Sequence, residues 1–509
     1  MTTKPKSPIE FSRAVDELTD RITSQSVALS DSFVKMLQKV CQVSTTTADR
    51  VAHSRDWWPL AMHWSLNGQT AKRADAICRP QSTKQVSEIV ALCAQHSVPV
   101  TVSGGRSGVC GAAIPVFGGV VIDMTSLAGV LNVDETSGLI EVLPGTFGPD
   151  LESTITQQHK LSVGHFPQSF DISTVGGWIG SRGAGQFSTR YGKIEDMVAG
   201  LEVVLADGSV ILTGTEPAGA AGPNLTALFI GSEGSLGIIT KVWLRAHPLP
   251  EVVKKAAYRF ATFALAVETM RSSVRNGATP AVLRLYDQRE SKRSHGGDGE
   301  SCTLLVLDQG LKPLVDATMQ IVDEFAITNG ATKTDEQLVE NWLHHRNDTS
   351  GLQALSTKGF VIDTMEVAVA WSRVNEVAEA VKTAIMQVAG ARSATCHISH
   401  SYIDGACIYF TFVAEPKPTT ESDTDKVALI EKTYRDIWDA AQMSALKSGA
   451  NLSHHHGVGI NRAKYMQLAL GSAHDVLSKI KNSLDPQDIL NPGKFSIKSK
   501  RGDFKLGAE

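Results

Sequence analysis

The spacing of apolar residues predicts a helical start to the chain, followed by alternating strands and helices. Within residues 1–70, four apolar side chains recur at the intervals of a helix face, namely Phe33, Met36, Leu37 and Val40. Residues 74–145 contain short runs rich in Val and Ile, and a helical pattern begins after Ser82. This alternation is typical of an α/β domain.

From about residue 250 the pattern changes to longer helices between strands. The segments YRFATFALAVETMRSSV and SRVNEVAEAVKTAIMQV are expected to be helical, and a pair of strands is expected in TCHISHSYIDGACIYFTFVAE. This order resembles a split β-α-β arrangement. The polar segment EPKPTTESDTDK, residues 415–426, is expected to be an exposed loop. We therefore expect four regions: a helical arm (1–72), a first domain (73–248), a second domain (249–450) and a C-terminal segment (451–509).

Composition narrows the class of protein. A length of 509 residues exceeds what one core usually holds, and 42% apolar with 20% charged residues is ordinary for a globular protein. No apolar run approaches the ~18 residues that a membrane helix requires. The net charge of −4 with interspersed signs argues against nucleic acid as a partner.

Cysteine usage and the two termini bear on location. The seven cysteines are scattered without a CxxC pair, which favours a reducing compartment. The polar N-terminus lacks the apolar core of a secretory signal, and the C-terminal GAE is not a peroxisomal address. We expect a cytoplasmic protein, and a homodimer is compatible with these features.

Three glycine-rich segments suggest a phosphate-bearing ligand. They are SGGRSGVCG (103–111), QSFDISTVGGWIGSRGAG (168–185) and GSEGSLGII (231–239). Glycine lets backbone N–H groups approach a diphosphate without obstruction, although each segment alone is equally compatible with a tight turn. The GxGxxG of a Rossmann fold and a Walker lysine are both absent from the first segment. Together, the three segments are typical of a site for one large, flat cofactor.

The order of these segments resembles a known family. The run SGGRSG, GHFPQSFDISTVGGWIGSRGAG, YGKIEDMVAGLEVVLADGSV and LFIGSEGSLGIITKVWLR resembles the FAD-binding domain of the vanillyl-alcohol oxidase/p-cresol methylhydroxylase superfamily, over residues 73–248. The C-terminal LDPQDILNPGK resembles the end of the same enzymes. The resemblance implies an α+β protein, with a two-subdomain α/β FAD-binding domain and a ferredoxin-like antiparallel-sheet substrate (cap) domain.

The resemblance also implies FAD contacts. The pyrophosphate would lie against Ser103, Gly104, Gly105, Arg106, Ser107 and Gly108. The flavin and its ribityl chain would lie against Ser169, Ser173, Thr174, Ser181 and Gly183, and the remaining contacts would come from Glu233, Gly234, Gly237 and Ile239. Members with covalent flavin often carry a histidine in the first loop. This loop carries Arg106 and Ser107 instead, so non-covalent FAD is expected.

Two further motifs indicate the branch of the superfamily. Metal-dependent 2-hydroxyacid dehydrogenases carry HxGDGNxH, whereas this chain has Tyr402 and Tyr409 near those histidine positions, so no metal is expected. YIDGACIYF, SHHHGVG and AVLRLYD together resemble alkylglycerone-phosphate synthase-like enzymes. That resemblance implies a catalytic tyrosine, Tyr409, and three flavin-proximal histidines, His454, His455 and His456.

The same resemblance and its departures indicate the substrate contacts. Arg284 would bind an anion or the substrate. Arg346 in WLHHRNDTSG is the nearest candidate for a second substrate arginine, and His397 stands where the synthases carry another arginine. His397 and His400 are expected to share one face of a strand. The alternative for both is that they only pack in the core and bind no substrate.

Flavin-dependent oxidation of an alcohol needs a base for the hydroxyl proton and a cation for any carboxylate. A tyrosine pKa of about 10 suits a base only when neighbours lower it, and we expect the histidines to do so. The sequence therefore predicts an FAD-dependent oxidoreductase that oxidises a small hydroxy acid or alcohol, with an unassigned electron acceptor. Two alternatives stay open: a synthase-like transferase of ether-lipid synthesis that uses FAD without net redox, and a non-catalytic flavin-fold binding protein. SHHHGVG itself is also compatible with a metal site or a plain polar loop.

Overall fold

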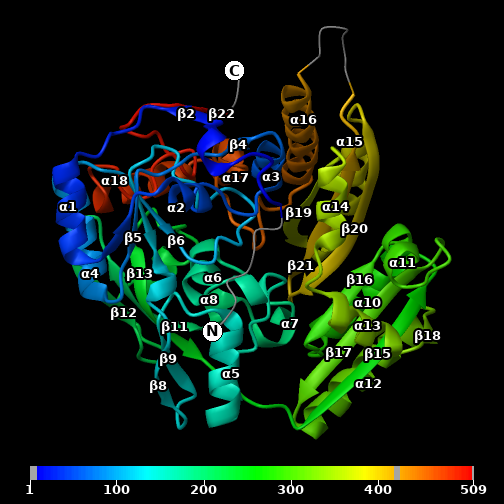
Figure 1. The fold of residues 1–509 in the computed structure, drawn as a ribbon. Coiled ribbons are helices and arrows are strands. Elements are labelled where there is room, and N and C mark those ends of the chain that lie inside the picture. The colour runs from blue at the N-terminus through cyan, green and yellow to red at the C-terminus, as the bar shows by residue number, and fades with distance from the viewer. Residues whose placement is uncertain (1–8, 418–424, 507–509) are drawn as a thin grey trace.

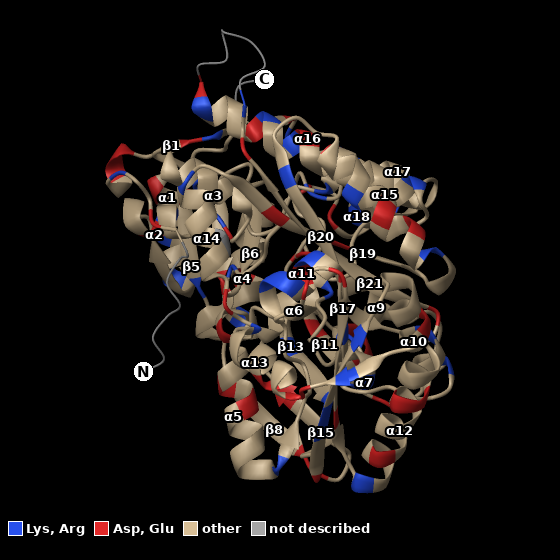
Figure 2. Ribbon diagram, turned by 90° about the vertical axis from the view of Figure 1, so that its right-hand side faces the viewer, with Lys and Arg blue, Asp and Glu red and all other residues tan. Residues whose placement is uncertain are grey.

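A computed structural model describes residues 9–417 and 425–506 of the chain (Figure 1). The expected loop at residues 415–426 falls largely outside these residues, as do the terminal tripeptide and the first eight residues. The described residues form three larger sheets, of four, five and seven strands. Lys and Arg alternate with Asp and Glu over the helices, without a basic stripe on the face shown (Figure 2).

The two smaller sheets carry the glycine-rich segments. The four-stranded sheet has the order β3-β5-β7-β6 (Gln42–Ser44, Ala76–Arg79, Val120–Asp123, Val100–Ser103), and its last three strands are parallel. The antiparallel five-stranded sheet has the order β12-β11-β13-β9-β8 (Val210–Gly214, Val198–Val204, Ile238–Arg245, Leu139–Val142, Val130–Asp134). Their helices are α4 (Thr83–Gln95), α5 (Gly148–His159), α6 (Val175–Ser181), α7 (Ser188–Tyr191), α8 (Ile194–Met197) and α9 (Leu225–Phe229). As predicted, Ser82 caps α4, by accepting the Gln85 N–H.

The seven-stranded sheet, here called the cap sheet, is antiparallel. Its order is β18-β15-β17-β16-β20-β21-β19 (Thr332–Thr334, Val252–Phe260, Cys302–Gly310, Val282–Tyr286, Ala391–Ser401, Gly405–Ala414, Val361–Ala370). Helices α10 (Phe263–Arg275), α12 (Lys312–Thr328), α15 (Val374–Met386) and α16 (Lys426–Lys447) lie along the sheet (Figure 1), and α11 (Gln288–Ser294), α13 (Gln337–His345) and α14 (Ser350–Thr357) are shorter. The first helix starts later than its sequence pattern suggested, because the tripeptide YRF continues β15 and Thr262 caps α10.

The N- and C-terminal segments close over the same side of the molecule. The first region contains α1 (Asp31–Val40), α2 (Thr47–Ala52) and α3 (Pro59–Leu66), together with the short strands β1 (Thr19–Asp20), β2 (Ile22–Ser24) and β4 (Gln69–Thr70). The last region contains α17 (Met466–Leu470), α18 (Ala473–Leu484) and β22 (Phe504–Leu506), and β22 pairs with β2 (Figure 1). The short strands β10 (Leu161–Ser162) and β14 (His247–Pro248) pair with each other.

Separate apolar cores hold the sheets. One core lies between the cap sheet and its helices, a second behind the five-stranded sheet, and a third around the four-stranded sheet. Together these elements confirm the expected α+β class, with two smaller sheets on the cofactor side and a larger antiparallel sheet on the other. Among the helices of the described residues, none combines the length and the apolar character that a membrane crossing requires.

Candidate flavin site

A cavity of about 580 Å³ lies between the glycine-rich segments and the cap sheet. Nearly all of the site residues that were predicted from the sequence line this cavity. The predicted residues that line it are Ser103, Gly104, Gly105, Arg106, Ser107, Gly108, Ser169, Ser173, Thr174, Ser181, Gly183, Glu233, Gly234, Gly237, Ile239, Arg284, Arg346, His397, Tyr409, His455 and His456. His454 is the exception, because it is buried behind this wall.

The first glycine-rich loop is shaped for an anion. A Cβ on Gly104 would lie 2.2 Å from Oγ1 of Thr174, and one on Gly105 would lie 2.0 Å from the carbonyl oxygen of Ile172. The buried hydroxyl of Ser103 has no hydrogen-bond partner among the described residues. Arg106 follows with a φ of +54°, and burial lowers the pKa of its guanidinium group. Backbone N–H groups free of side chains, an unpartnered hydroxyl group and a half-buried cation fit a pyrophosphate.

Glu233 joins the third glycine-rich segment to the histidine loop, residues 453–459. Its carboxylate accepts the N–H groups of Val458 at 2.6 Å and Gly459 at 2.9 Å. A Cβ on Gly457 would lie 2.4 Å from the Glu233 carboxylate, so a side chain there would clash. Glu233 thus lines the cavity while its carboxylate positions the histidine loop.

A second carboxylate, Glu366 on β19, holds the same loop from the cap side. It accepts the backbone N–H groups of His454 at 3.2 Å, His455 at 3.1 Å and His456 at 2.5 Å, and pairs with Arg462 at 3.0 Å. Burial disfavours the ionised carboxylate, but Arg462 and His456 outweigh burial, and the pKa of Glu366 lies well below its ordinary value. The fixed negative charge therefore orients three consecutive backbone N–H groups.

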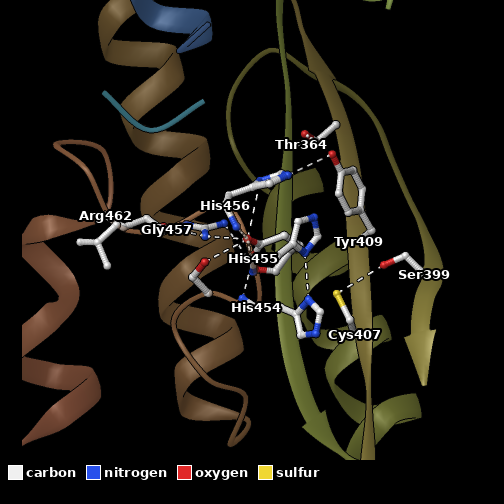
Figure 3. A network of polar contacts seen from close by, with 12 residues as sticks. Thr364, Ser399, Cys407, Tyr409, His454, His455, His456, Gly457 and Arg462 are labelled. Carbon is white, nitrogen blue, oxygen red and sulfur yellow. Dashed lines mark hydrogen bonds and ion pairs between the residues drawn. The ribbon is translucent and has the colours of Figure 1, made fainter. Parts of the chain in front are cut away.

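Tyr409 on β21 presents its hydroxyl group at the cavity. Its oxygen lies 3.0 Å from Oγ1 of Thr364 and 3.4 Å from Nε2 of His456 (Figure 3). The ring of His397, its cross-strand neighbour, stacks on Tyr409 with centroids 4.9 Å apart. Burial raises the pKa of Tyr409 above its ordinary value. The expectation that the histidines lower this pKa is therefore wrong for the free protein.

The histidines do not supply the charge that would lower it. Burial lowers the pKa of His454 to about 3 and of His456 to about 4, and it moves the pKa of His455 and of His400 well below the ordinary value. All four rings are neutral at pH 7. A neutral phenol beside neutral imidazoles is suited to donate a hydrogen bond or a proton, and the imidazoles are suited to accept one.

Arg284 on β16 lies beside His397. Its Nη2 is 2.9 Å from Nε2 of His397, and the other ring nitrogen, Nδ1, is 2.9 Å from Glu290. Since Arg284 can only donate, His397 accepts at Nε2 and donates from Nδ1 to the Glu290 carboxylate. Burial disfavours the Glu290 anion, yet His397 outweighs burial, and the pKa of Glu290 is lowered. Glu290 therefore fixes the ring that faces Arg284.

Arg346, at the end of α13, has no carboxylate partner among the described residues. Its Nη1 is buried without a hydrogen bond, and its guanidinium group lies against Phe166, Phe187 and Trp342 at 5.3 to 5.8 Å. Arg284 packs on the same indole at 5.2 Å. Burial, with the charge of Arg284 second, lowers the pKa of Arg346. Two unneutralised cations on one cavity wall are suited to an anion.

His400 faces the same cavity as His397 because of a β-bulge. The pairing of β20 with β21 shifts between Ile398 and His400, which places His400 opposite Cys407 and His397 opposite Tyr409. The shift returns both histidines to one face, as expected, and both line the cavity. One ring nitrogen from each of His400, His454 and His455 lies within 4.8 Å of the others.

Sequence reasoning missed several residues that shape this site. Glu366, Glu290 and Trp342 contact predicted residues, and Arg462 pairs with Glu366, but none of the four was singled out from the sequence. A signal for Glu366 existed, since the otherwise apolar run VIDTMEVAVA contains two carboxylates, Asp363 and Glu366, and a carboxylate that is buried must find a partner. Nothing in the sequence indicated that the partner would be Arg462, 96 residues away.

Comparisons with known proteins agree with this geometry. The family described as "FAD binding domain" matches residues 74–214, and "FAD linked oxidases, C-terminal domain" matches residues 249–495. Alkyldihydroxyacetonephosphate synthase of Dictyostelium discoideum is 30% identical, over 84% of this chain and 74% of the relative. Glycolate oxidase subunit GlcD of Bacillus subtilis is 27% identical, over 90% of this chain and 94% of the relative.

Solved structures share the fold. An alkyldihydroxyacetonephosphate synthase superposes with a TM-score of 0.77 and 25% identity, covering 96% of this chain and 90% of that one. p-Cresol methylhydroxylase superposes with a TM-score of 0.71 and 16% identity, covering 93% and 99%. The fold and the cavity thus define an FAD-binding flavoprotein of the p-cresol methylhydroxylase type. The chain belongs to the FAD-linked oxidase family, as the sequence predicted.

Proposed function

We propose that this protein is an FAD-dependent oxidoreductase that oxidises a small, anionic, hydroxylated substrate such as a 2-hydroxy acid. The observation that carries the proposal is the pair Arg284 and Arg346 on the wall opposite the FAD loops, beside the acid–base groups Tyr409 and His455. When bound, FAD would supply the two-electron acceptor for the hydride that the hydroxyl-bearing carbon of the substrate loses.

Residues of the chain divide the remaining tasks. Arg284 and Arg346 hold the carboxylate, which fixes the direction of the carbon–hydrogen bond. The neutral imidazole of His455 accepts the hydroxyl proton, and Tyr409 donates a hydrogen bond that stabilises the oxygen as negative charge develops. FAD is held non-covalently, since Arg106 and Ser107 occupy the loop where covalent members carry histidine.

The composition of the cavity wall supports a small polar substrate. Most of the cap residues that line it are polar: Arg284, Arg293, Arg346, Asn347, Thr349, Gln353, Ser356, Asp363, Thr364, His397, Ser399, His400, Tyr409 and Thr411, beside the apolar Trp342 and Ile362. A wall of this kind suits a substrate that is charged and hydrogen-bonded along its length.

A synthase-like transferase is the second candidate, and one feature favours it. Ile9, Trp57, Pro59 and Met62 give the cavity an apolar stretch from the N-terminal region, where an alkyl chain could lie. The likeness to alkyldihydroxyacetonephosphate synthase also favours it. Such an enzyme would use FAD without net redox.

One anaerobic experiment separates these candidates. Purified holoenzyme is mixed with glycolate, D-lactate, D-2-hydroxyglutarate or an acyl-dihydroxyacetone phosphate plus a fatty alcohol, and the flavin band near ~450 nm is followed together with the products. Bleaching by a hydroxy acid with release of the oxo acid supports the oxidoreductase. Release of fatty acid with incorporation of the alcohol and no net bleaching supports the transferase. A protein that binds FAD but gives neither result contradicts both.

A further inference from the structure

Five polar side chains form a continuous series of hydrogen bonds that leaves the cavity wall at one point and returns at another. His455 and His400 line the cavity, whereas His454, Tyr402 and Ser188 lie behind its wall. The bonds run from His455 Nδ1 to His454 Nδ1 at 2.8 Å, from His454 Nε2 to the Tyr402 hydroxyl at 2.7 Å, from Tyr402 to the Ser188 hydroxyl at 3.4 Å, and from Ser188 to His400 Nδ1 at 2.6 Å. Figure 3 shows the first bond, between His454 and His455.

Every member of this series can pass on a proton. A neutral imidazole has one N–H donor and one nitrogen acceptor, and a hydroxyl group both donates and accepts. The three histidines are neutral at pH 7 because burial lowers their pKa, and burial likewise keeps the Tyr402 phenol protonated by raising its pKa. Each group therefore carries one movable proton, four of which bridge neighbouring groups, and none of the groups has to be charged.

In two arrangements of these protons all four bonds point in the same direction along the series. In the first, each group donates toward His400: His455 Nδ1–H to His454, His454 Nε2–H to Tyr402, Tyr402 O–H to Ser188, and Ser188 O–H to His400 Nδ1. This leaves Nε2 of His455 bare and Nε2 of His400 protonated, both at the cavity. In the second, every donor and acceptor is exchanged, so the free proton is on His455.

We propose that this series is a proton relay, in which a proton accepted by Nε2 of His455 is matched by a proton released from Nε2 of His400. The relay rests on the oxidoreductase proposed above, whose substrate must lose a hydroxyl proton. The substrate O–H bond breaks and its proton joins His455, while the carbon-bound hydrogen leaves with its electron pair as hydride to FAD. The four bridging protons shift by one position each, and the His400 Nε2–H bond breaks to give its proton to water in the cavity.

The relay removes the main obstacle to a base at this place. A single buried histidine that took the proton would become an imidazolium ion, which burial and the nearby Lys193 ammonium group, 2.7 Å from the carbonyl oxygen of His454, both disfavour. Concerted transfer avoids that charge. The Ser188–Tyr402 step is the longest at 3.4 Å, so it limits the transfer and is the best place to break it.

Tyr402→Phe removes the hydroxyl group that joins the two halves, and Ser188→Ala breaks the next link should the first variant fold poorly. Neither residue lines the cavity. The matched control is Tyr258→Phe, which loses a hydroxyl bonded to Asp323 at 2.8 Å in the cap sheet.

With the holoenzyme and a hydroxy acid that bleaches it, we expect flavin reduction to slow by about a hundredfold in either relay variant, with unchanged substrate Kd. The rate in mixtures of H2O and D2O should fall along a curve in the wild type, as several protons move together, and along a line in the variants.

A second readout does not depend on turnover. In FAD-loaded protein with 15N-labelled histidine, the ring-nitrogen shifts of His455 and His400 report which nitrogen carries the proton. We expect Tyr402→Phe to change the tautomer of both rings, although Tyr402 contacts neither of the two in the series, and Tyr258→Phe to change neither.

The outcomes are decisive for each proposal. Unchanged tautomers together with a wild-type rate would overturn the relay and leave the oxidoreductase standing. Coupled tautomers in a protein that no hydroxy acid bleaches would show that the series is connected, but would overturn the oxidoreductase and with it the transfer of a substrate proton through the relay. A stoichiometric transition metal that is lost in His454→Gln would overturn the relay, because nitrogens bound to a metal cannot carry its protons.

Discussion

Glu366 and Arg462 form an ion pair of 3.0 Å with both side chains fully buried, directly behind the histidine loop. The same carboxylate oxygen of Glu366 also accepts hydrogen bonds from the backbone N–H groups of His455 and His456. Buried charge is costly unless it is paired and hydrogen-bonded. Here Glu366 is paired and accepts backbone N–H groups as well, while Nε of Arg462 has no hydrogen-bond partner among the described residues. The cap sheet, through Glu366 on β19, therefore fixes the position of the histidine loop.

Glu366→Gln should therefore destabilise the protein strongly. The amide removes the negative charge while Arg462 stays buried, and breaking such a pair from one side costs about 3–5 kcal/mol. The free energy of unfolding, measured in denaturant, should fall by that amount. The control is Glu376→Gln, which breaks the exposed pair with Arg373 at 2.8 Å and should change the free energy by less than about 1 kcal/mol. Equal effects in the two variants would contradict the structural role of Glu366.

The same carboxylate predicts a sensitivity to acid. The pKa of Glu366 is lower in the folded protein than in the unfolded chain, so its contribution to stability is fully present above about pH 4.3 and is lost as the pH falls toward the folded pKa. Wild-type protein should lose stability steeply below this pH. The Glu366→Gln variant lacks this group, so the difference in unfolding free energy between the two proteins should shrink as the pH falls from 5 toward 3. A constant difference over that range would contradict the assignment.

The first glycine-rich loop allows a sharp test of FAD binding. In Gly105→Ala the new Cβ would meet the carbonyl oxygen of Ile172 at 2.0 Å, which is backbone and cannot move aside easily. We expect the purified variant to be largely colourless, with flavin content measured by absorbance and by release on acid precipitation. Gly219→Ala, with open space around the new Cβ, should keep its flavin. A yellow Gly105→Ala protein would mean that the loop does not hold the cofactor.

The cofactor was predicted from the order of the glycine-rich segments, which resembles a known family, whereas local patterns predicted single features. Small residues in a run, such as Gly104 and Gly105, have a physical meaning that does not depend on the rest of the chain, because only they leave the backbone accessible. Ser82 could be identified as a helix cap for the same reason. The strand pair that carries His397 and Tyr409 followed from its alternating apolar positions.

The electrostatics of the site could not be predicted in this way. The sequence suggested that three histidines would lower the pKa of Tyr409, but pKa values depend on burial, which here keeps the rings neutral and raises the pKa of the phenol. Arg462 lies far from Glu366 along the chain, and Ser188 far from Tyr402. Contacts between residues so far apart along the chain depend on how the sheets pack against each other. No local pattern in a single sequence predicts them.

The arginine pair predicts the charge of the substrate. In Arg346→Met, loss of a half-buried cation with no carboxylate partner among the described residues should weaken the binding of oxalate, used as a probe anion, by about 10- to 100-fold. Titration of the flavin spectrum gives the Kd. Arg289→Met, at an exposed position of α11, is the control and should bind oxalate like the wild type. If inorganic phosphate bound far more tightly than oxalate and showed the same dependence on Arg346, a phosphorylated substrate would be indicated instead of a hydroxy acid.

Tyr409 gives the most direct test of the chemistry. Tyr409→Phe keeps the ring that stacks on His397 and removes only the hydroxyl group that contacts Thr364 and His456. Because that group acts on the developing charge of the reacting oxygen, kcat for hydroxy-acid oxidation should fall by about 10²- to 10⁴-fold while KM and FAD content stay nearly unchanged. Tyr465→Phe is the matched control, since its buried hydroxyl bonds Asp439 at 2.6 Å outside the cavity. A rise in KM with kcat preserved would instead make Tyr409 a binding residue and leave His455 as the catalytic group beside the flavin.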